Sequence, residues 1–276
     1  MGILITGASS YVGARIYSDL GNKFDVRGTY LKNKLFQELE QLDITKKESV
    51  DKIIGILKPD VIIHTAAIPS ASWCEKNPDL AKQINIQGTK NVINAAKDIG
   101  AKVIYISSFA AIHPSSLYGK TKFDSEEYVK QSGLNFVIFR PSLIIGQSPN
   151  TTNDRPHNRL LKNITEKTRP VYDTSWKFQP TWLGHLSECI DSVIERGIKN
   201  EIIPLAVPEL KSRYDIAKDI LSNFNIITIP EDKKKNQIPV LREELSKLTD
   251  LNLPQYSYEE IIIKVVNEIK DYLKTR

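Results

Sequence analysis

The sequence is poor in cysteine, methionine and histidine, and it lacks a long apolar run. Its 276 residues include 2 cysteines, 1 methionine and 4 histidines. Cys74 and Cys189 are far apart and show no metal-ligand spacing, which excludes a disulfide scaffold and favours reduced thiols in a cytoplasmic protein. The histidines are isolated from one another, so we predict no metal site. No run of about 18 apolar residues occurs, so the sequence predicts no transmembrane helix.

Neither sign of charge dominates the chain. Its 38 basic residues are scattered among 33 acidic ones, for a net charge of +5 at pH 7. The densest basic cluster, Lys233 to Lys235, is typical of a solvated loop, so we predict no nucleic-acid partner. The apolar share of 41% and the length suit an ordinary globular chain with one large domain or two smaller ones.

The stretch 2–13 indicates how the rest of the chain folds. Its apolar run at 3–5 is typical of a strand buried on both faces of a parallel sheet. Gly7 ends the run and a helical pattern begins at Tyr11, so the first N–H groups of that helix are placed to bind an anion. Gly7 and Gly13 match the outer glycines of a dinucleotide-binding turn, with Ser10 in the middle position. A tight strand–helix connection is the alternative interpretation.

Strands and helices then alternate up to residue 140. We expect further strands at 25–30, 39–44, 59–64, 103–106 and 135–139, with helices at 46–57, 79–99 and 118–132. This order predicts an α/β fold with a doubly wound parallel sheet of the Rossmann type. Ligands bind such sheets at the carboxyl ends of the strands, where the chain places Gly7, Ala66, Ser108 and Pro141.

The remainder of the chain is less regular. Helices are expected at 155–167, 184–196, 213–224 and 257–273, a strand at 202–207, and loops over 229–254. We predict that residues 1–146, with about 180–205, form the nucleotide-binding domain. Residues 147–179 and 206–276 would form a small α/β substrate-binding domain. The last helix carries an apolar stripe from Ile261 to Leu273. Packing against the core and a homodimer contact are the two alternative interpretations of this stripe.

Three positions at the expected sheet edge bear on the cofactor. The window 31–34 contains Lys32 and Lys34 but no carboxylate, which favours the 2′-phosphate of NADP over the 2′-hydroxyl of NAD. Two solvated loop lysines are the alternative. Asp43 is placed either to bind the adenine amino group or to cap the next helix. Ala66 and Ala67 are small enough to let a cofactor lie across the strand end.

Tyr118 and Lys122 are four residues apart on an expected helix and therefore share a face. A free tyrosine has a pKa of about 10 and is a poor proton donor or acceptor near neutrality. An ammonium group nearby lowers that pKa, so we expect Lys122 to activate Tyr118. Ser108, at a strand end, can bond the same carbonyl oxygen that the tyrosine protonates. Two hydroxyls on one carbonyl beside a nicotinamide are what hydride transfer requires.

These motifs resemble those of the extended short-chain dehydrogenase/reductases. The resemblance covers nearly the whole chain and rests on six strings: Ile5–Gly13, His64–Ala67, Ile84–Thr89, Tyr105–Ser108, Tyr118–Lys122 and Phe139–Ser142. Within the family the chain is most similar to the dTDP-4-dehydrorhamnose reductase branch, which includes the regulatory β-subunit of methionine adenosyltransferase. Trp73–Ala81 and Phe178–Thr181 resemble that branch.

The resemblance implies a role for each matching position. The implied catalytic residues are Ser108, Tyr118 and Lys122. The implied cofactor residues are Gly7, Ser10, Tyr11, Val12 and Gly13 at the pyrophosphate, Lys32 at the 2′-phosphate, Asp43 and Ile44 at the adenine, Ala66 and Ala67 at the adjoining ribose, and Tyr118 and Lys122 at the nicotinamide ribose. Arg155, Arg159 and Lys162, on one expected helix, are placed to bind a nucleotide diphosphate or to form a solvated face.

Three departures from the family pattern narrow the function. Ser10 replaces the middle glycine, Phe109-Ala110 replaces the usual Asp-Tyr after Ser108, and the segment from Ser108 to Tyr118 is short. Phe109-Ala110 excludes a sugar dehydratase, which needs an acidic pair there. The expected function is NADPH-dependent reduction of a keto group on a nucleotide-activated sugar. The alternatives are an NADP-binding regulatory subunit without turnover and an NAD-dependent epimerase.

Overall fold

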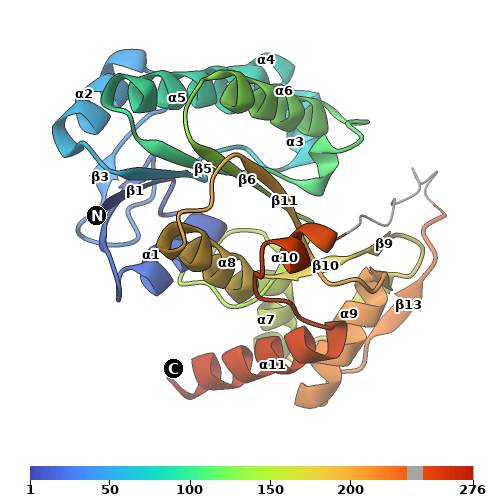
Figure 1. Ribbon diagram of the computed structural model, residues 1–276. Helices are drawn as coiled ribbons and strands as arrows, with labels where there is room; N and C mark the ends of the chain where they lie inside the picture. Colours follow the sequence, from blue (N-terminus) through green and yellow to red (C-terminus); the bar gives the residue numbers. More distant parts are fainter. Residues whose placement is uncertain (235–244, 276) are drawn as a thin grey trace.

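The computed structural model describes residues 1–234 and 245–275. Its centre is a sheet of seven parallel strands in the order β11-β6-β5-β4-β1-β2-β3 (Figure 1). The strands are β1 (Gly2–Thr6), β2 (Asp25–Tyr30), β3 (Glu40–Gln41), β4 (Val61–His64), β5 (Lys102–Ile106), β6 (Phe136–Pro141) and β11 (Glu201–Leu205). The order reverses between β1 and β4, so the predicted doubly wound α/β fold is confirmed.

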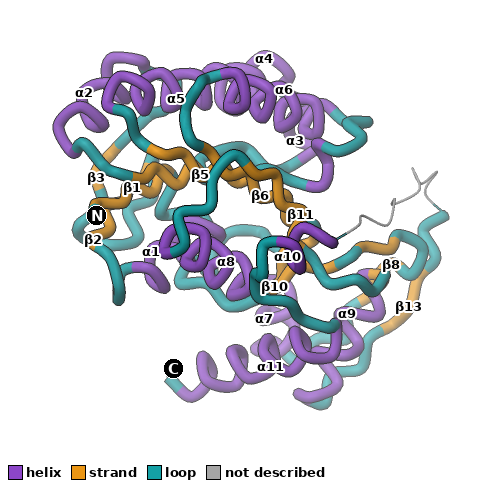
Figure 2. Tube along the Cα trace, viewed as in Figure 1, coloured by secondary structure: helices purple, strands orange, loops and turns teal. Residues whose placement is uncertain are grey.

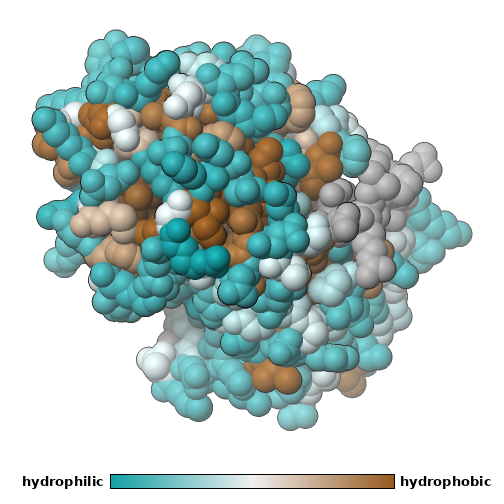
Figure 3. Space-filling view, in the orientation of Figure 1, coloured by the Kyte–Doolittle hydropathy of each residue, from teal (hydrophilic) through white to brown (hydrophobic). Residues whose placement is uncertain are grey.

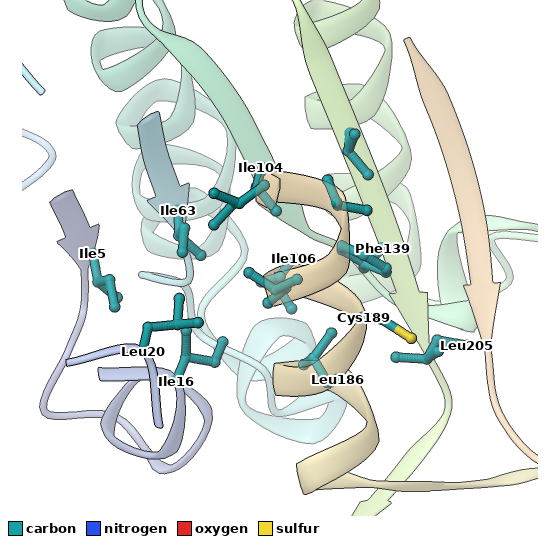
Figure 4. Close-up of a cluster of buried hydrophobic side chains, with 14 of the residues drawn as sticks. Ile5, Ile16, Leu20, Ile63, Ile104, Ile106, Phe139, Leu186, Cys189 and Leu205 are labelled. Atoms are coloured by element: carbon teal, nitrogen blue, oxygen red, sulfur yellow. The ribbon is translucent and has the colours of Figure 1, made fainter. Parts of the chain in front are cut away.

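Helices cover both faces of this sheet (Figure 2). On one face lie α2 (Lys47–Leu57), α5 (Gly88–Ile99) and α6 (Leu117–Gln131), and on the other lie α1 (Tyr11–Leu20) and α8 (Leu183–Glu195). Side chains alternate along each strand, so Ile3 and Ile5 pack against α1 and α8 while Leu4 packs toward α2 and α5. Figure 4 shows the core beneath α8. Burial on both faces explains why β1 is continuously apolar.

A second group of elements packs below the carboxyl edge of the sheet. Helices α7 (Pro156–Glu166), α9 (Arg213–Leu221) and α11 (Tyr258–Lys274) surround a further apolar cluster. Three two-stranded sheets border it, pairing β7 (Leu143–Ile145) with β10 (Pro180–Trp182), β8 (Val171–Asp173) with β13 (Ile229–Glu231), and β9 (Lys177–Phe178) with β12 (Lys211–Ser212). Ile261, Val265 and Ile269 are fully buried in this cluster, so core packing accounts for the stripe on α11.

Several elements differ from their sequence prediction. The third strand is only two residues long, and the expected helix 79–99 is divided into α4 (Pro78–Lys82), a π-helical turn (Gln83–Gln87) and α5. Helix α3 (Ala71–Lys76), helix α10 (Ser246–Asp250) and the short strands were not predicted, because elements of two to six residues carry little periodicity. The part of the predicted loop at 235–244, including Lys235, lies outside the described residues.

The segment after β7 is tied to the turn between β1 and α1. The hydroxyl of Tyr11 donates to the carbonyl of Gly146 at 2.5 Å. Ser148 Oγ donates to the carbonyl of Tyr11 at 2.7 Å, and Asn150 Nδ2 donates to the carbonyl of Ser9 at 2.6 Å. Segment 146–150 therefore holds the outer side of the glycine turn.

The surface is largely polar. The face in Figure 3 is mostly hydrophilic, with apolar side chains in small groups between polar ones. Within the described part of the chain, no helix combines the length and apolarity that a membrane span needs.

Candidate active site

The turn after β1 is shaped so that two of its positions accept only glycine. Gly7 has a φ of +74°, and a Cβ there would lie 2.9 Å from the Cα of Ala66. A Cβ on Gly13 would lie 2.3 Å from the carbonyl oxygen of Gly7 and 2.7 Å from Thr65 Oγ1. All three distances are far below van der Waals contact. The turn therefore packs so closely on itself and on the residues after β4 that no side chain fits at either position.

Ser10 takes the middle position without strain. Its φ of −74° is accessible to any residue, and its Oγ caps α1 by accepting from the backbone N–H of Gly13 at 3.0 Å. Tyr11 and Val12 are the first two residues of α1, so their N–H groups have no carbonyl partner within the helix. The departure at Ser10 therefore keeps an anion-binding helix N-terminus.

The loop after β2 lies beside this turn. Leu35 donates its backbone N–H to Ser9 Oγ at 3.2 Å, which fastens the loop to the residues just before α1. Lys32 and Lys34 are both exposed, and Lys34 Nζ lies 5.9 Å from the centroid of the Tyr30 ring. Two cations without a carboxylate between residues 31 and 36 are the charge arrangement that a phosphate group requires. Their role at a 2′-phosphate stays a prediction.

The two positions predicted at the adenine have their own local contacts. Asp43 Oδ1 accepts from the backbone N–H of Thr45 at 2.9 Å and from its hydroxyl at 2.7 Å. The N-cap of α2 is Lys46, so Asp43 closes the preceding turn and does not cap the helix. Ile44 is buried against Gly88, where a Cβ would lie 2.6 Å from Ile44 Cδ1. Both residues lie directly after β3, on the carboxyl side of the sheet.

Ser108, Tyr118 and Lys122 are brought together by β5 and α6. Ser108 follows the end of β5, and its hydroxyl lies close enough to the phenol of Tyr118 to lower the pKa of that phenol. Helix α6 begins just before Tyr118, because Ser116 caps the N–H of Gly119 at 3.1 Å and Glu75 of α3 accepts from the N–H of Leu117 at 2.7 Å. The serine and tyrosine hydroxyls therefore meet at the same edge as the glycine turn.

The short segment before Tyr118 is a compact 3-10 turn. Residues Phe109–Ala111 form it, and Ser108 Oγ accepts from the N–H of Ala110 at 3.2 Å. A Cβ on Gly119 would lie 2.4 Å from the carbonyl oxygen of Ala110, so the turn rests directly on the first turn of α6. Gly119 is the residue that makes so short a connection feasible.

The expected action of Lys122 on Tyr118 stays a prediction. Burial raises the pKa of Tyr118, while the nearby hydroxyl of Ser108 and the guanidinium of Arg155 lower it in part. Lys122 donates to the carbonyl of Ile106 at 2.6 Å and lies 4.2 Å from the centroid of the Tyr105 ring. Burial lowers the pKa of Lys122 to about 7. Lys122 is thus bonded to the end of β5, and the guanidinium of Arg155 is a second positive charge that lowers the pKa of the Tyr118 phenol.

The basic residues expected on one helix separate in the structure. Arg155 immediately precedes α7 and is close enough to Tyr11 and Tyr118 to interact electrostatically with both. Arg159 pairs with Asp154, with Nη2 and Oδ2 2.6 Å apart. Lys162 is exposed and lies 3.9 Å from Glu166, which suits a solvated face.

Sequence reasoning missed Arg213, at the start of α9. Burial lowers the pKa of the Arg213 guanidinium, and repulsion by the nearby charge of Arg159 lowers it further. Its Nε is buried, and within the described residues it has no hydrogen-bond partner. The ring of Phe178 lies 5.5 Å from the guanidinium carbon. Arg213 is more than fifty positions after Arg159, so no local pattern connects the two.

Two other side chains near the site have clear roles in packing. His64 bonds Thr6 Oγ1 at 2.6 Å through Nδ1 and Thr89 Oγ1 at 3.0 Å through Nε2. Burial lowers its pKa to about 3, so it is a neutral core histidine. Cys74 of α3 is buried near enough to Tyr118 to raise the pKa of that phenol, a proximity the sequence did not reveal. No group of three metal-ligating side chains occurs over residues 1–234 and 245–275.

Curated relatives of this chain include the β subunit of methionine adenosyltransferase 2. The Xenopus laevis protein is 31% identical over 242 residues, which cover 81% of this chain and 72% of that protein. The Bos taurus protein is 30% identical over 159 residues, covering 52% of this chain. That match spans about half, 47%, of the bovine protein.

Solved structures of nucleotide-sugar enzymes share the fold. A dTDP-4-dehydrorhamnose reductase from Bacillus anthracis str. Ames, in complex with NADP, is 24% identical with a TM-score of 0.84 and covers 97% of this chain and 99% of that chain. A UDP-glucose 4-epimerase from Thermus thermophilus, in complex with NAD, is 18% identical with a TM-score of 0.83 and covers 98% and 99%. Structural neighbours of this chain therefore include both an NADP and an NAD complex.

The family model of the RmlD substrate binding domain matches residues 1–269. This match covers the sheet, the glycine turn, the Ser108–Tyr118–Lys122 set and the elements below the sheet edge. It confirms the resemblance drawn from the sequence motifs. The chain thus belongs to the RmlD substrate binding domain family, within the extended short-chain dehydrogenase/reductases.

Proposed function

We propose that this protein is an NADPH-dependent reductase of a keto group, most consistent with a nucleotide-activated deoxysugar as substrate. The observation that carries the proposal is the proximity of the Ser108 hydroxyl to the Tyr118 phenol, at the sheet edge that also holds the glycine turn. When bound there, the reduced nicotinamide supplies a hydride to the substrate carbonyl. The residues of the chain then supply a cofactor cradle, a proton and an anion site for the substrate.

The turn suits a dinucleotide because it leads directly into a helix N-terminus. Glycine at positions 7 and 13 lets β1, α1 and the end of β4 pack closely, and the helix N-terminus at Tyr11 and Val12 offers N–H groups to the pyrophosphate. Lys32 would hold the 2′-phosphate. Asp43 and Ile44 would face the adenine, and Ala66 and Ala67 the adjoining ribose.

Tyr118 is the proposed proton donor. Its phenol is protonated over the whole neutral range, because burial raises its pKa. Ser108 would hold the carbonyl oxygen so that it accepts the proton from Tyr118 as the hydride arrives. The guanidinium of Arg155 stabilises the phenolate that remains after transfer. Lys122 would hold the nicotinamide ribose together with Tyr118.

The arginines below the edge support an anionic substrate. Arg159 and Arg213 repel each other electrostatically, and Arg213 Nε is buried without a hydrogen-bond partner in the described chain. A diphosphate between them would relieve the repulsion and accept the free donor. Arg155 lies between this region and Tyr118, which suits a substrate that runs from a diphosphate to a reacting sugar.

A regulatory NADP-binding subunit is the second candidate. Two observations favour it. The chain is similar to the methionine adenosyltransferase β subunit, and Phe109 occupies the position where the reductase branch has an acidic residue. An NAD-dependent epimerase is the third, and the lysines at 32 and 34 argue against it. Co-purification with a partner enzyme and no NADPH oxidation would support the regulatory candidate.

The test is NADPH oxidation by the purified protein against a panel of dTDP- and UDP-ketosugars, read by absorbance. Replacement Tyr118→Phe should lower turnover by about two orders of magnitude or more, since general acid catalysis contributes that much. Its NADPH affinity, measured by fluorescence titration, should change little. Wild-type turnover by Tyr118→Phe would reject the assignment of the proton donor, and absence of NADPH binding by the wild type would reject the reductase.

A further inference from the structure

A buried charge network lies behind the catalytic set and is not used by the mechanism above. Glu126 of α6 is fully buried. Its carboxylate accepts from Arg140 of β6, with Nε at 3.0 Å from Oε1 and Nη2 at 2.5 Å from Oε2, and from the hydroxyl of Ser107. The side chain of Arg140 is 18% exposed, so this ion pair is closed to solvent on the glutamate side only.

The network joins the two elements that carry the catalytic residues. Ser107 stands between Ile106, whose carbonyl receives Lys122, and Ser108. Glu126 follows Lys122 by one helical turn on the same face of α6. A carboxylate bonded to the end of β5 and to the end of β6 therefore fixes α6 against both strand ends. The positions of Ser108 and Lys122 depend on that contact.

Few titratable groups surround Lys122, and only some of them are charged. The titratable groups that face it are Tyr118 and Glu126 on α6, Tyr105 on β5 and His64 on β4, with Arg140 of β6 behind Glu126. His64 is neutral because burial lowers its pKa to about 3. Tyr105 is neutral as well, since burial raises its pKa. Glu126 is the negative charge that raises the pKa of Lys122, against the larger effect of burial, which lowers it. The same carboxylate is bonded to Arg140.

We propose that Glu126 is a positioning residue that holds Lys122 in its ammonium form, with Arg140 setting how much of the carboxylate charge Lys122 experiences. The proposal rests on the proposed function, because Lys122 matters there as the group that holds the nicotinamide ribose. It predicts opposite effects of the two partners. Removing the glutamate charge makes Lys122 lose its proton at lower pH, and removing the arginine charge makes it keep the proton to higher pH.

The experiment is a fluorescence titration of the full chain with NADPH between pH 6 and pH 9. Glu126→Gln keeps the shape of the side chain and removes its charge. The pH above which NADPH affinity declines should fall by about 1 unit, the lower end of the effect of one nearby charge. At pH 8 this corresponds to about tenfold weaker binding than in the wild type, and the affinities should converge toward pH 6. Arg140→Gln should shift the decline to higher pH.

Glu127→Gln is the matched control. Glu127 is the next residue of α6, and its carboxylate pairs with Lys130 at the surface, so its removal should leave the profile unchanged. Equal profiles for Glu126→Gln and the wild type, or shifts of both network variants in one direction, would overturn the proposal. If Glu126→Gln shows no cooperative melting, the test rests on Arg140→Gln alone. The proposal is then overturned unless the pH above which NADPH affinity declines is higher in Arg140→Gln than in the wild type. No NADPH binding by the wild type would instead reject the proposed function.

Discussion

Adding one methyl group to the glycine turn tests whether that turn is the cofactor cradle. In Gly13→Ala the new Cβ would lie 2.3 Å from the carbonyl oxygen of Gly7 and 2.9 Å from its carbonyl carbon. Both are backbone atoms, so relief requires α1 to move away from the end of β1. Overpacking of this kind costs about 1–3 kcal/mol of the free energy of unfolding. The same movement would displace the N–H groups of Tyr11 and Val12, so NADPH affinity should fall by about tenfold or more, which is about 1.4 kcal/mol.

Gly55 provides the matched control for this substitution. It lies exposed within α2, and a Cβ there meets no atom within 4 Å. Gly55→Ala should therefore raise the free energy of unfolding by about 0.5–1 kcal/mol through helix propensity, with NADPH affinity unchanged. Urea denaturation and fluorescence titration of both variants measure the two quantities. Equal stability and equal NADPH affinity of the two variants would refute the steric argument.

The remaining predictions concern pH and cofactor choice. Burial lowers the folded-state pKa of His64 and His157 to about 3 and of His185 to about 4. Protonation therefore favours the unfolded chain, so stability is complete above about pH 6.5 and falls below it, by about 2 kcal/mol per histidine at pH 5. Urea denaturation at pH 7 and pH 5 measures this loss of the free energy of unfolding. The loss should be smaller in His157→Gln, and an equal loss in that variant and the wild type would contradict the prediction. Lys32→Ala should weaken NADPH binding by about tenfold, as expected for one hydrogen bond to a charged group, and leave NADH binding unchanged. Equal loss for both cofactors would remove Lys32 from the 2′-phosphate.

The sheet and its ligand edge could be predicted because their signals are local. Each buried parallel strand is a short apolar run, and the glycine turn and the Tyr118–Lys122 spacing lie within single elements. Even so, the expected third strand at 39–44 reduces to Glu40–Gln41. Its apolar residues, Leu39, Leu42 and Ile44, are buried in cores on opposite faces without continuous strand pairing.

The rest of the site depends on contacts between distant parts of the sequence. Lys122 also donates to the carbonyl of Ile106, a contact that the helical spacing does not report. A charge that lowers the pKa of the phenol comes from Arg155, 37 residues later and in an irregular region. The sequence indicates only part of the Glu126 network. Glu126 shares a helical face with Lys122, but its partner Arg140 is on a strand, and no local pattern connects the two. No local pattern indicates the place of Arg213 either.

The bonds from segment 146–150 to the glycine turn decide which parts of the molecule can move independently. The carbonyls of Ser9 and Tyr11 and the hydroxyl of Tyr11 are all engaged by that segment, which leads directly into Arg155 and α7. Swinging α7 away from the sheet would break three hydrogen bonds beside the glycine turn. We therefore expect any opening for ligands to come from elements other than this junction, with the stretch that carries Arg155 as a fixed wall between the proposed cofactor and substrate regions.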